Sequence, residues 1–94
     1  HLQNQNLNSK NEVLNSYKIF PNPTQDFVTI DNISYEDTQF DVVIYDATGR
    51  FLLQAKCNSK KNIIIVKKFE NGFYQIKIFK EGNLILSEKL IIIK

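Results

Sequence analysis

The feature that most constrains the fold is a series of short apolar runs, each about four to ten residues long and bounded by turn residues. These runs are rich in β-branched and aromatic residues, which favour a pleated sheet over a helix. Residues 40–45 (FDVVIY) and 73–79 (FYQIKIF) alternate, so every second side chain falls on one face of a strand. Turn signals recur about every 8 to 12 residues. The sequence therefore predicts an all-β fold, an immunoglobulin-like antiparallel β-sandwich of six to seven strands.

The expected strands are bounded by proline, glycine or runs of polar residues, and they span 17–20, 27–31, 40–45, 50–56, 63–66, 73–79 and 84–93. Residues 46–49 (DATG) suit a type I turn closed by a glycine with positive φ, and Gly72 is expected to be a turn glycine as well. The polar residues 87–89 suggest a β-bulge in the last strand. Phe69, next to the Gly72 turn, is expected to be buried between the sheets.

Residues 1–16 differ in composition from the rest of the chain. Asparagine and serine dominate there, and apolar residues are sparse and aperiodic, which is typical of a flexible linker. Residues 17–94 form the expected domain. The chain contains no methionine, so we expect it to be processed or cut from a larger protein.

Composition argues against several classes of function. The net charge is only +2 and the lysines are scattered or paired, so a nucleic-acid partner is not expected. His1 and Cys57 are single copies, which supports neither a histidine-activated nucleophile nor a zinc site. Cys57 is expected to be a small, partly buried apolar residue. Glu36 and Asp37 are expected to be solvated loop charges, and a loop calcium site formed by Asp31, Glu36 and Asp37 is the alternative. We therefore expect no catalytic residues, no cofactor and no metal.

Four short motifs stand in order along the chain. Residues 20–23 (FPNP) precede a strand containing 28–30 (VTI), residues 46–50 are DATGR, residues 69–74 are FENGFY, and residues 89–94 are KLIIIK. In this order they resemble the C-terminal sorting domain of the type IX secretion system, the Por secretion system tail of type A. That family has Tyr-Pro-Asn-Pro, Leu-x-Ile, Asp-x-x-Gly-Lys and Leu-x-x-Gly-x-Tyr motifs and a basic-apolar end. The resemblance covers residues 17–94.

One departure from the family pattern is visible. The family often has a strand of the type Ile-Asp-Leu-Ser before the Leu-x-x-Gly motif, whereas residues 64–67 here are IIVK. Ile65 stands where the family has an outward polar residue, so an exposed apolar patch is expected there.

The resemblance implies that the domain ends a larger secreted protein and is recognised by the type IX translocon. It implies passage through the periplasm and across the outer membrane with an upstream cargo domain, to the medium or the cell surface. Cleavage by a sortase-like peptidase is implied near the linker, before Tyr17, with attachment of the new C-terminus of the cargo to surface lipopolysaccharide. The candidate sorting and recognition residues are those of the matched motifs: Pro21, Asn22, Pro23, Asp46, Gly49, Arg50, Gly72, Tyr74, Lys89, Leu90, Ile91, Ile92, Ile93 and Lys94.

Alternatives to this interpretation remain open. Residues 21–23 are expected to form a rigid turn that sets the first hairpin, and a recognition surface is the alternative. The last strand must complete a sheet, and its edge is also a candidate for recognition by the translocon. The rival function is a small adhesive or carbohydrate-binding sandwich, with Tyr35, Tyr45 and Phe79 as an exposed aromatic platform.

Overall fold

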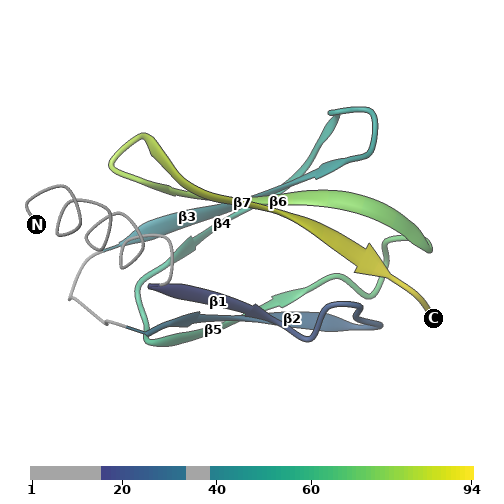
Figure 1. Cartoon of the computed structure of the whole chain (residues 1–94), viewed down its shortest axis with the longest axis horizontal. Coiled ribbons are helices and arrows are strands. Elements are labelled where there is room, and N and C mark those ends of the chain that lie inside the picture. The colour runs from purple at the N-terminus through teal and green to yellow at the C-terminus, as the bar shows by residue number, and fades with distance from the viewer. Residues whose placement is uncertain (1–15, 34–38) are drawn as a thin grey trace, which may run out of the picture.

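The computed structural model describes residues 16–33 and 39–94, and within them the chain forms seven strands. Their bounds are β1 Tyr17–Phe20, β2 Phe27–Asn32, β3 Phe40–Asp46, β4 Phe51–Cys57, β5 Lys61–Ile65, β6 Gly72–Lys80 and β7 Asn83–Ile92. The strands form one sheet of order β1-β2-β5 and a second of order β4-β3-β6-β7 (Figure 1). All the strand pairs within these sheets are antiparallel. The predicted antiparallel β-sandwich is confirmed.

The chain changes sheets between β2 and β3, between β4 and β5, and between β5 and β6. Connections that cross from one layer to the other are typical of immunoglobulin-like sandwiches. The three-stranded sheet lies below the four-stranded sheet in Figure 1, and the chain ends at the side opposite the β6–β7 turn.

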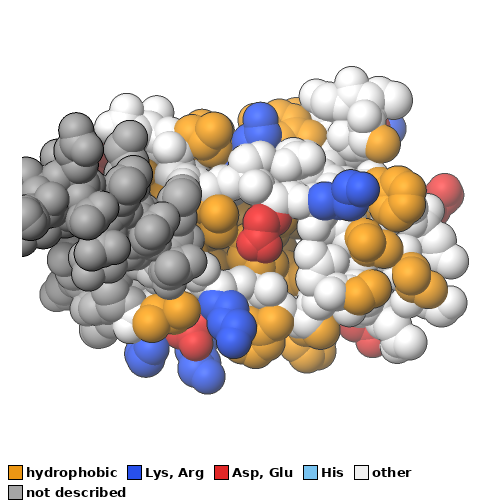
Figure 2. Space-filling view, viewed as in Figure 1, with side chains coloured by type: hydrophobic (Ala, Val, Ile, Leu, Met, Phe, Trp, Pro, Cys, Tyr) orange, Lys and Arg blue, Asp and Glu red, His pale blue; other side chains and the backbone are white. Residues whose placement is uncertain are grey.

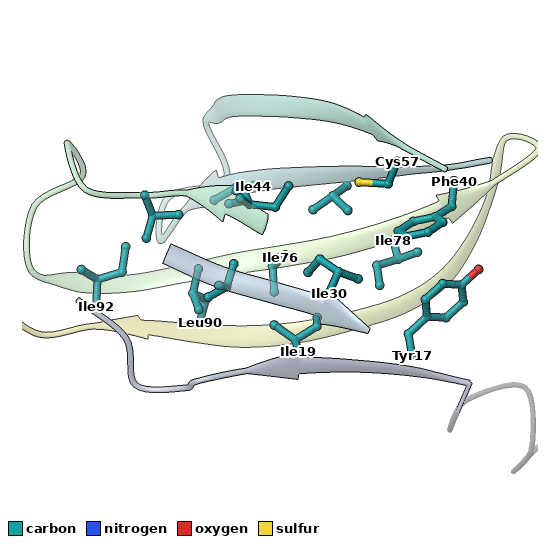
Figure 3. Close-up of a cluster of buried hydrophobic side chains, with 14 residues drawn as sticks. Tyr17, Ile19, Ile30, Phe40, Ile44, Cys57, Ile76, Ile78, Leu90 and Ile92 are labelled. Carbon is teal, nitrogen blue, oxygen red and sulfur yellow. The ribbon is translucent and has the colours of Figure 1, made fainter. Parts of the chain in front are cut away.

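The core lies between the two sheets and comes from alternate residues of each strand (Figure 3). The residues expected to share one face of β3 are Phe40, Val42 and Ile44, and each is at most 2% exposed. Val28 and Ile30 of β2 are fully buried opposite them. The period of two in the sequence therefore predicted correctly which side chains of these strands share a face, and the structure shows that this face is the buried one.

The β-bulge of the last strand is displaced from its predicted place. Residues 87–89 pair in regular register with residues 75–77, so the prediction of a bulge there is wrong. The register instead shifts where Ile78 pairs with Leu86 and Phe79 pairs with Leu84, which makes Ile85 the extra residue. This bulge lies close to the β6–β7 turn, where Glu81 and Gly82 both have positive φ, as a tight two-residue hairpin requires.

The sequence also predicted the burial or exposure of Phe69, Ile65 and Cys57. Phe69 was expected to be buried between the sheets, and this prediction is wrong. It is partly buried and packs against the edge of the core. Ile65 is 59% exposed, which confirms the expected apolar exposure at that position. Cys57 is only 4% exposed, and burial, together with the nearby Asp41 carboxylate, raises the pKa of its thiol to about 11.

Truncation of an isoleucine to alanine should cost much more free energy of unfolding on the inward face of a strand than on the outward face. Ile76→Ala should lower the free energy of unfolding by about 2–5 kcal/mol, because it leaves a cavity between the sheets. Ile65→Ala should change it by only about 0.5 kcal/mol, because the side chain is exposed. Urea unfolding followed by fluorescence or circular dichroism measures both. Equal losses for the two variants would contradict the assignment of inward and outward faces.

Candidate functional site

The segment between β1 and β2, two strands of the three-stranded sheet, reaches the edge of the four-stranded sheet. Thr24 forms an isolated parallel bridge with Ile92 of β7. Its N–H donates to the carbonyl of Ile91 at 2.9 Å, and the N–H of Ile93 donates to the carbonyl of Thr24 at 2.9 Å. The start of the domain therefore pairs with the outer edge of its last strand.

Asn22 extends this pairing with its side chain. Its Nδ2 donates to the carbonyl of Lys89 at 2.7 Å, and its Oδ1 accepts from the N–H of Ile91 at 3.0 Å. An edge strand otherwise presents such backbone groups to any passing strand. Pro21 and Pro23, which flank Asn22, have fixed φ and no N–H, and so restrict the backbone that carries its side chain. The predicted rigid turn therefore also closes the β7 edge.

A third residue holds the chain after β7. The N–H of Lys94 donates to Oδ1 of Asn71 at 3.0 Å, and the Lys94 ammonium donates to the carbonyl of Lys67. Asn71 lies within the FENGFY motif, 23 residues before Lys94. We call Asn22, Thr24 and Asn71 the terminal clamp, because together they hold residues 89–94.

The rest of the FENGFY motif forms a tyrosine corner. The hydroxyl of Tyr74 donates to the carbonyl of Glu70 at 2.5 Å, back across the turn that enters β6. Phe69 stacks on the Tyr74 ring with 5.6 Å between centroids. Burial, followed by the Glu70 and Asp46 carboxylates, raises the pKa of Tyr74. Gly72, predicted to be a turn glycine, is the first residue of β6 and has φ +157°. This corner positions Asn71 beside the end of the chain.

The DATGR motif forms a second, self-contained cluster at the β3–β4 turn. Oδ1 of Asp46 accepts from the N–H and hydroxyl of Thr48 and from the N–H of Arg50, at 2.6–2.9 Å. Its Oδ2 lies 3.2 Å from Nε of Arg50. Gly49 has φ +91° and donates to the Asp46 carbonyl, as expected for this turn. The Thr48 hydroxyl first, and the Arg50 N–H next, lower the pKa of Asp46.

Only some side chains of the terminal segment, residues 89–94, are exposed at the surface. Leu90 and Ile92, two of the candidate recognition residues, are fully buried and pack in the core. Ile93 is 54% exposed and Phe73 on the neighbouring strand is 57% exposed. The Lys89 ammonium lies 5.0 Å from the Phe73 ring centroid. Figure 2 shows apolar side chains gathered toward the end of the molecule at which the chain terminates.

The structure brings the predicted residues of the first, third and fourth motifs together around β7. The prediction that a partner recognises the edge of the last strand stays untested, but the backbone groups of Lys89, Ile91 and Ile93 that face outward are already paired. Sequence reasoning missed Thr24 and Asn71. Both stand beside a proline or glycine turn, where polar side chains commonly bond to the backbone.

Other sequence hypotheses find little support in the described residues. Within 16–33 and 39–94 no group of three or more metal-ligating side chains lies together, and Asp31 pairs with Lys60 at 3.2 Å. Glu36, Asp37 and Tyr35 lie outside the described residues, as does the proposed linker up to residue 15. No helix in the part of the chain that the structure describes is long and apolar enough to span a membrane.

Comparison with known proteins agrees with these motifs. The family described as "Secretion system C-terminal sorting domain" matches residues 18–94. A curated protein from Nonlabens ulvanivorans, ulvan lyase NLR42, is 32% identical over 95 residues. The match covers 98% of this chain but 17% of that protein. The chain therefore belongs to the family of secretion-system C-terminal sorting domains, as its sequence predicted, and such a tail directs export across the outer membrane to the cell surface or the medium.

The terminal clamp can be tested through Asn22. Asn22→Ala removes two hydrogen bonds to β7 and should lower the free energy of unfolding by about 1–3 kcal/mol. Hydrogen exchange should accelerate most at the Ile91 amide, which donates to Asn22. Asn58→Ala, an exposed asparagine in the β4–β5 loop, is the matched control and should leave that amide protected. Unchanged protection of Ile91 in the Asn22 variant would contradict the clamp.

The turn cluster predicts a specific pH dependence. Because the folded-state pKa of Asp46 lies below its ordinary value of 3.8, its charge stabilises the fold above that pH, and this stabilisation is lost as the pH falls through the folded-state pKa. Asp46→Asn should therefore melt below the parent temperature at neutral pH. The difference should shrink in strongly acidic buffer. Thermal melts at both pH values test this, and a difference that grows on acidification would contradict it.

Proposed function

We propose that the folded tail, with its last strand held in place, is the form that the type IX export machinery recognises. The observation that supports this most directly is the terminal clamp. Asn22 and Thr24 bond to residues 89–93 from the opposite end of the domain, and Asn71 bonds to Lys94. These contacts exist only in the folded state, since they join residues that are far apart in sequence.

The outward side chains of the terminal strand form the recognition surface in this proposal. Ile93 and Phe73 leave more than half of their surface exposed, and Lys89 places a positive charge over the Phe73 ring. An exposed apolar patch rimmed by polar residues is typical of a protein interaction site. Asp46, Gly49, Arg50, Gly72 and Tyr74 act indirectly, by fixing the turns that present this surface.

The proposal also includes a cargo domain upstream of the tail and cleavage between the two. The relative that matches is a lyase of which this region is a small share, and we assign to this chain the same arrangement, a larger cargo upstream. Residues 1–16 serve as the linker, and a sortase-like peptidase cleaves before Tyr17. Attachment of the new C-terminus of the cargo to surface lipopolysaccharide follows.

The tail takes no catalytic role in this proposal. The Cys57 thiol is buried and its raised pKa keeps it protonated at neutral pH. The Asp46 carboxylate is engaged by Thr48 and Arg50. The described side chains best suited to chemistry are therefore committed to the fold.

A reporter fusion tests the proposal. Residues 1–94 are fused behind a soluble reporter that is first delivered to the periplasm of a host with a type IX system. The intact fusion should reach the cell surface or the medium, and deletion of residues 89–94 should stop export. Asn22→Ala should reduce export, whereas Asn58→Ala and His1→Ala should not. Retention of the intact, folded parent fusion in the periplasm would overturn the proposal.

A further inference from the structure

The outer face of the four-stranded sheet carries a hollow of about 580 Å³. Figure 1 shows the β3–β4 turn and the β6–β7 turn bending away from the other sheet at opposite ends of this face. The hollow lies beside the β3–β4 turn, and the side chains that matter for its chemistry are Tyr45, Phe73, Gln75, Lys77, Ser87 and Lys89. Its size lies within the roughly 300–1,000 Å³ of ligand pockets and far above that of a single ion.

Two ammonium groups lie in this hollow, each held over an aromatic ring. Nζ of Lys77 is 5.2 Å from the Tyr45 ring centroid, and Nζ of Lys89 is 5.0 Å from that of Phe73. Lys77 pairs with Ser87 and Lys89 pairs with Gln75 across β6 and β7, so the two lysines are diagonal neighbours on one face. Diagonal neighbours in an antiparallel pair are about 7–8 Å apart, so an anion between the two lysines would offset their mutual repulsion.

The hollow holds little negative charge to offset these lysines. The ion pairs of the described residues involve Arg50, Lys56 and Lys60, not Lys77 or Lys89. Asp46 also lines the hollow, but its carboxylate is engaged by Thr48 and Arg50. A negatively charged ligand would therefore find two cations without a carboxylate partner.

Polar groups between the two lysines suit the hydroxyls of a sugar. Nε2 of Gln75 donates to Oγ of Ser87 at 2.7 Å. The Ser87 hydroxyl hydrogen and the Gln75 carbonyl oxygen are then a donor and an acceptor for a ligand. Each of the Tyr45 and Phe73 rings carries an ammonium group over it, which favours an anionic ligand there over a neutral sugar stacked on the same ring face.

We infer that this hollow binds an acidic saccharide unit, a uronate or a sulfated sugar. Its anionic group lies between Lys77 and Lys89, and its hydroxyls meet Gln75 and Ser87. This site differs from the aromatic platform that includes Tyr45 and Phe79, because the two lysine ammonium groups, and not the aromatic rings, contact the ligand. The inference goes beyond export and does not rest on it.

The purified 94-residue chain is titrated with three oligosaccharides and one salt, followed by amide chemical shifts in NMR. Tetragalacturonate and a sulfated carrageenan tetrasaccharide are the anionic probes. Cellotetraose is the neutral probe and sodium sulfate is the ion alone. At least one anionic probe should bind saturably, shift the amides of Gln75, Lys77 and Ser87, and weaken as sodium chloride rises. The probe that binds more tightly distinguishes carboxylate from sulfate.

Matched variants locate the site. Lys77→Gln should weaken binding of the anionic probe about tenfold, since it removes a charge-assisted hydrogen bond, and Lys77→Arg should retain most of the affinity. Lys61→Gln, which removes the same charge from the other sheet, should change affinity less than about twofold. Thermal melts confirm that each variant folds. Failure of both anionic probes, equal binding of cellotetraose, equal losses in Lys61→Gln, or full competition by sulfate at equal concentration would each overturn the inference.

Discussion

The structure depends on closing the outer edge of β7. A small sandwich has four sheet edges, and each exposes backbone N–H and C=O groups that can pair with another chain. β7 is the longest strand, so it has the longest edge. Asn22 and Thr24 pair with the last part of this edge, and the bulge at Ile85 and the inward-facing Glu88 interrupt the first part. The strand is thereby fixed at both ends without a further strand beside it.

The same contacts explain why the sequence motifs stand so far apart. Residues 20–23 and 69–74 flank the last strand in space, and each contributes an asparagine to it. Proline on both sides of Asn22 and the tyrosine corner beside Asn71 limit the motion of those two side chains. Two of the four motifs therefore contact the terminal strand through their asparagines. In our two proposals, partners contact outward side chains such as Ile93 and Lys89, together with the hollow around Lys77.

Several features followed from local sequence. The alternation in residues 40–45 and 73–79 sorted the side chains onto two faces correctly, because the side-chain period of a strand is two. The turn at residues 46–49 followed from an aspartate and a glycine whose preferences are local. The bulge could not be placed, because the polar run at 87–89 is tolerated on an edge strand and the register is set by the nearby hairpin turn. Phe69 was placed too deep because the sequence pattern did not show that its ring stacks on Tyr74 beside the turn that enters β6.

The sequence by itself determined the fold class, the strands, the turn types and the family, because strand period and turn chemistry depend on neighbouring residues. Only the tertiary structure decided which side chains meet. It placed Asn22 on Lys89 and Ile91, Asn71 on Lys94, and two lysines side by side over aromatic rings. These contacts join residues on different strands, and their geometry is set by the register of the sheet and the stacking of two layers, which no local pattern encodes.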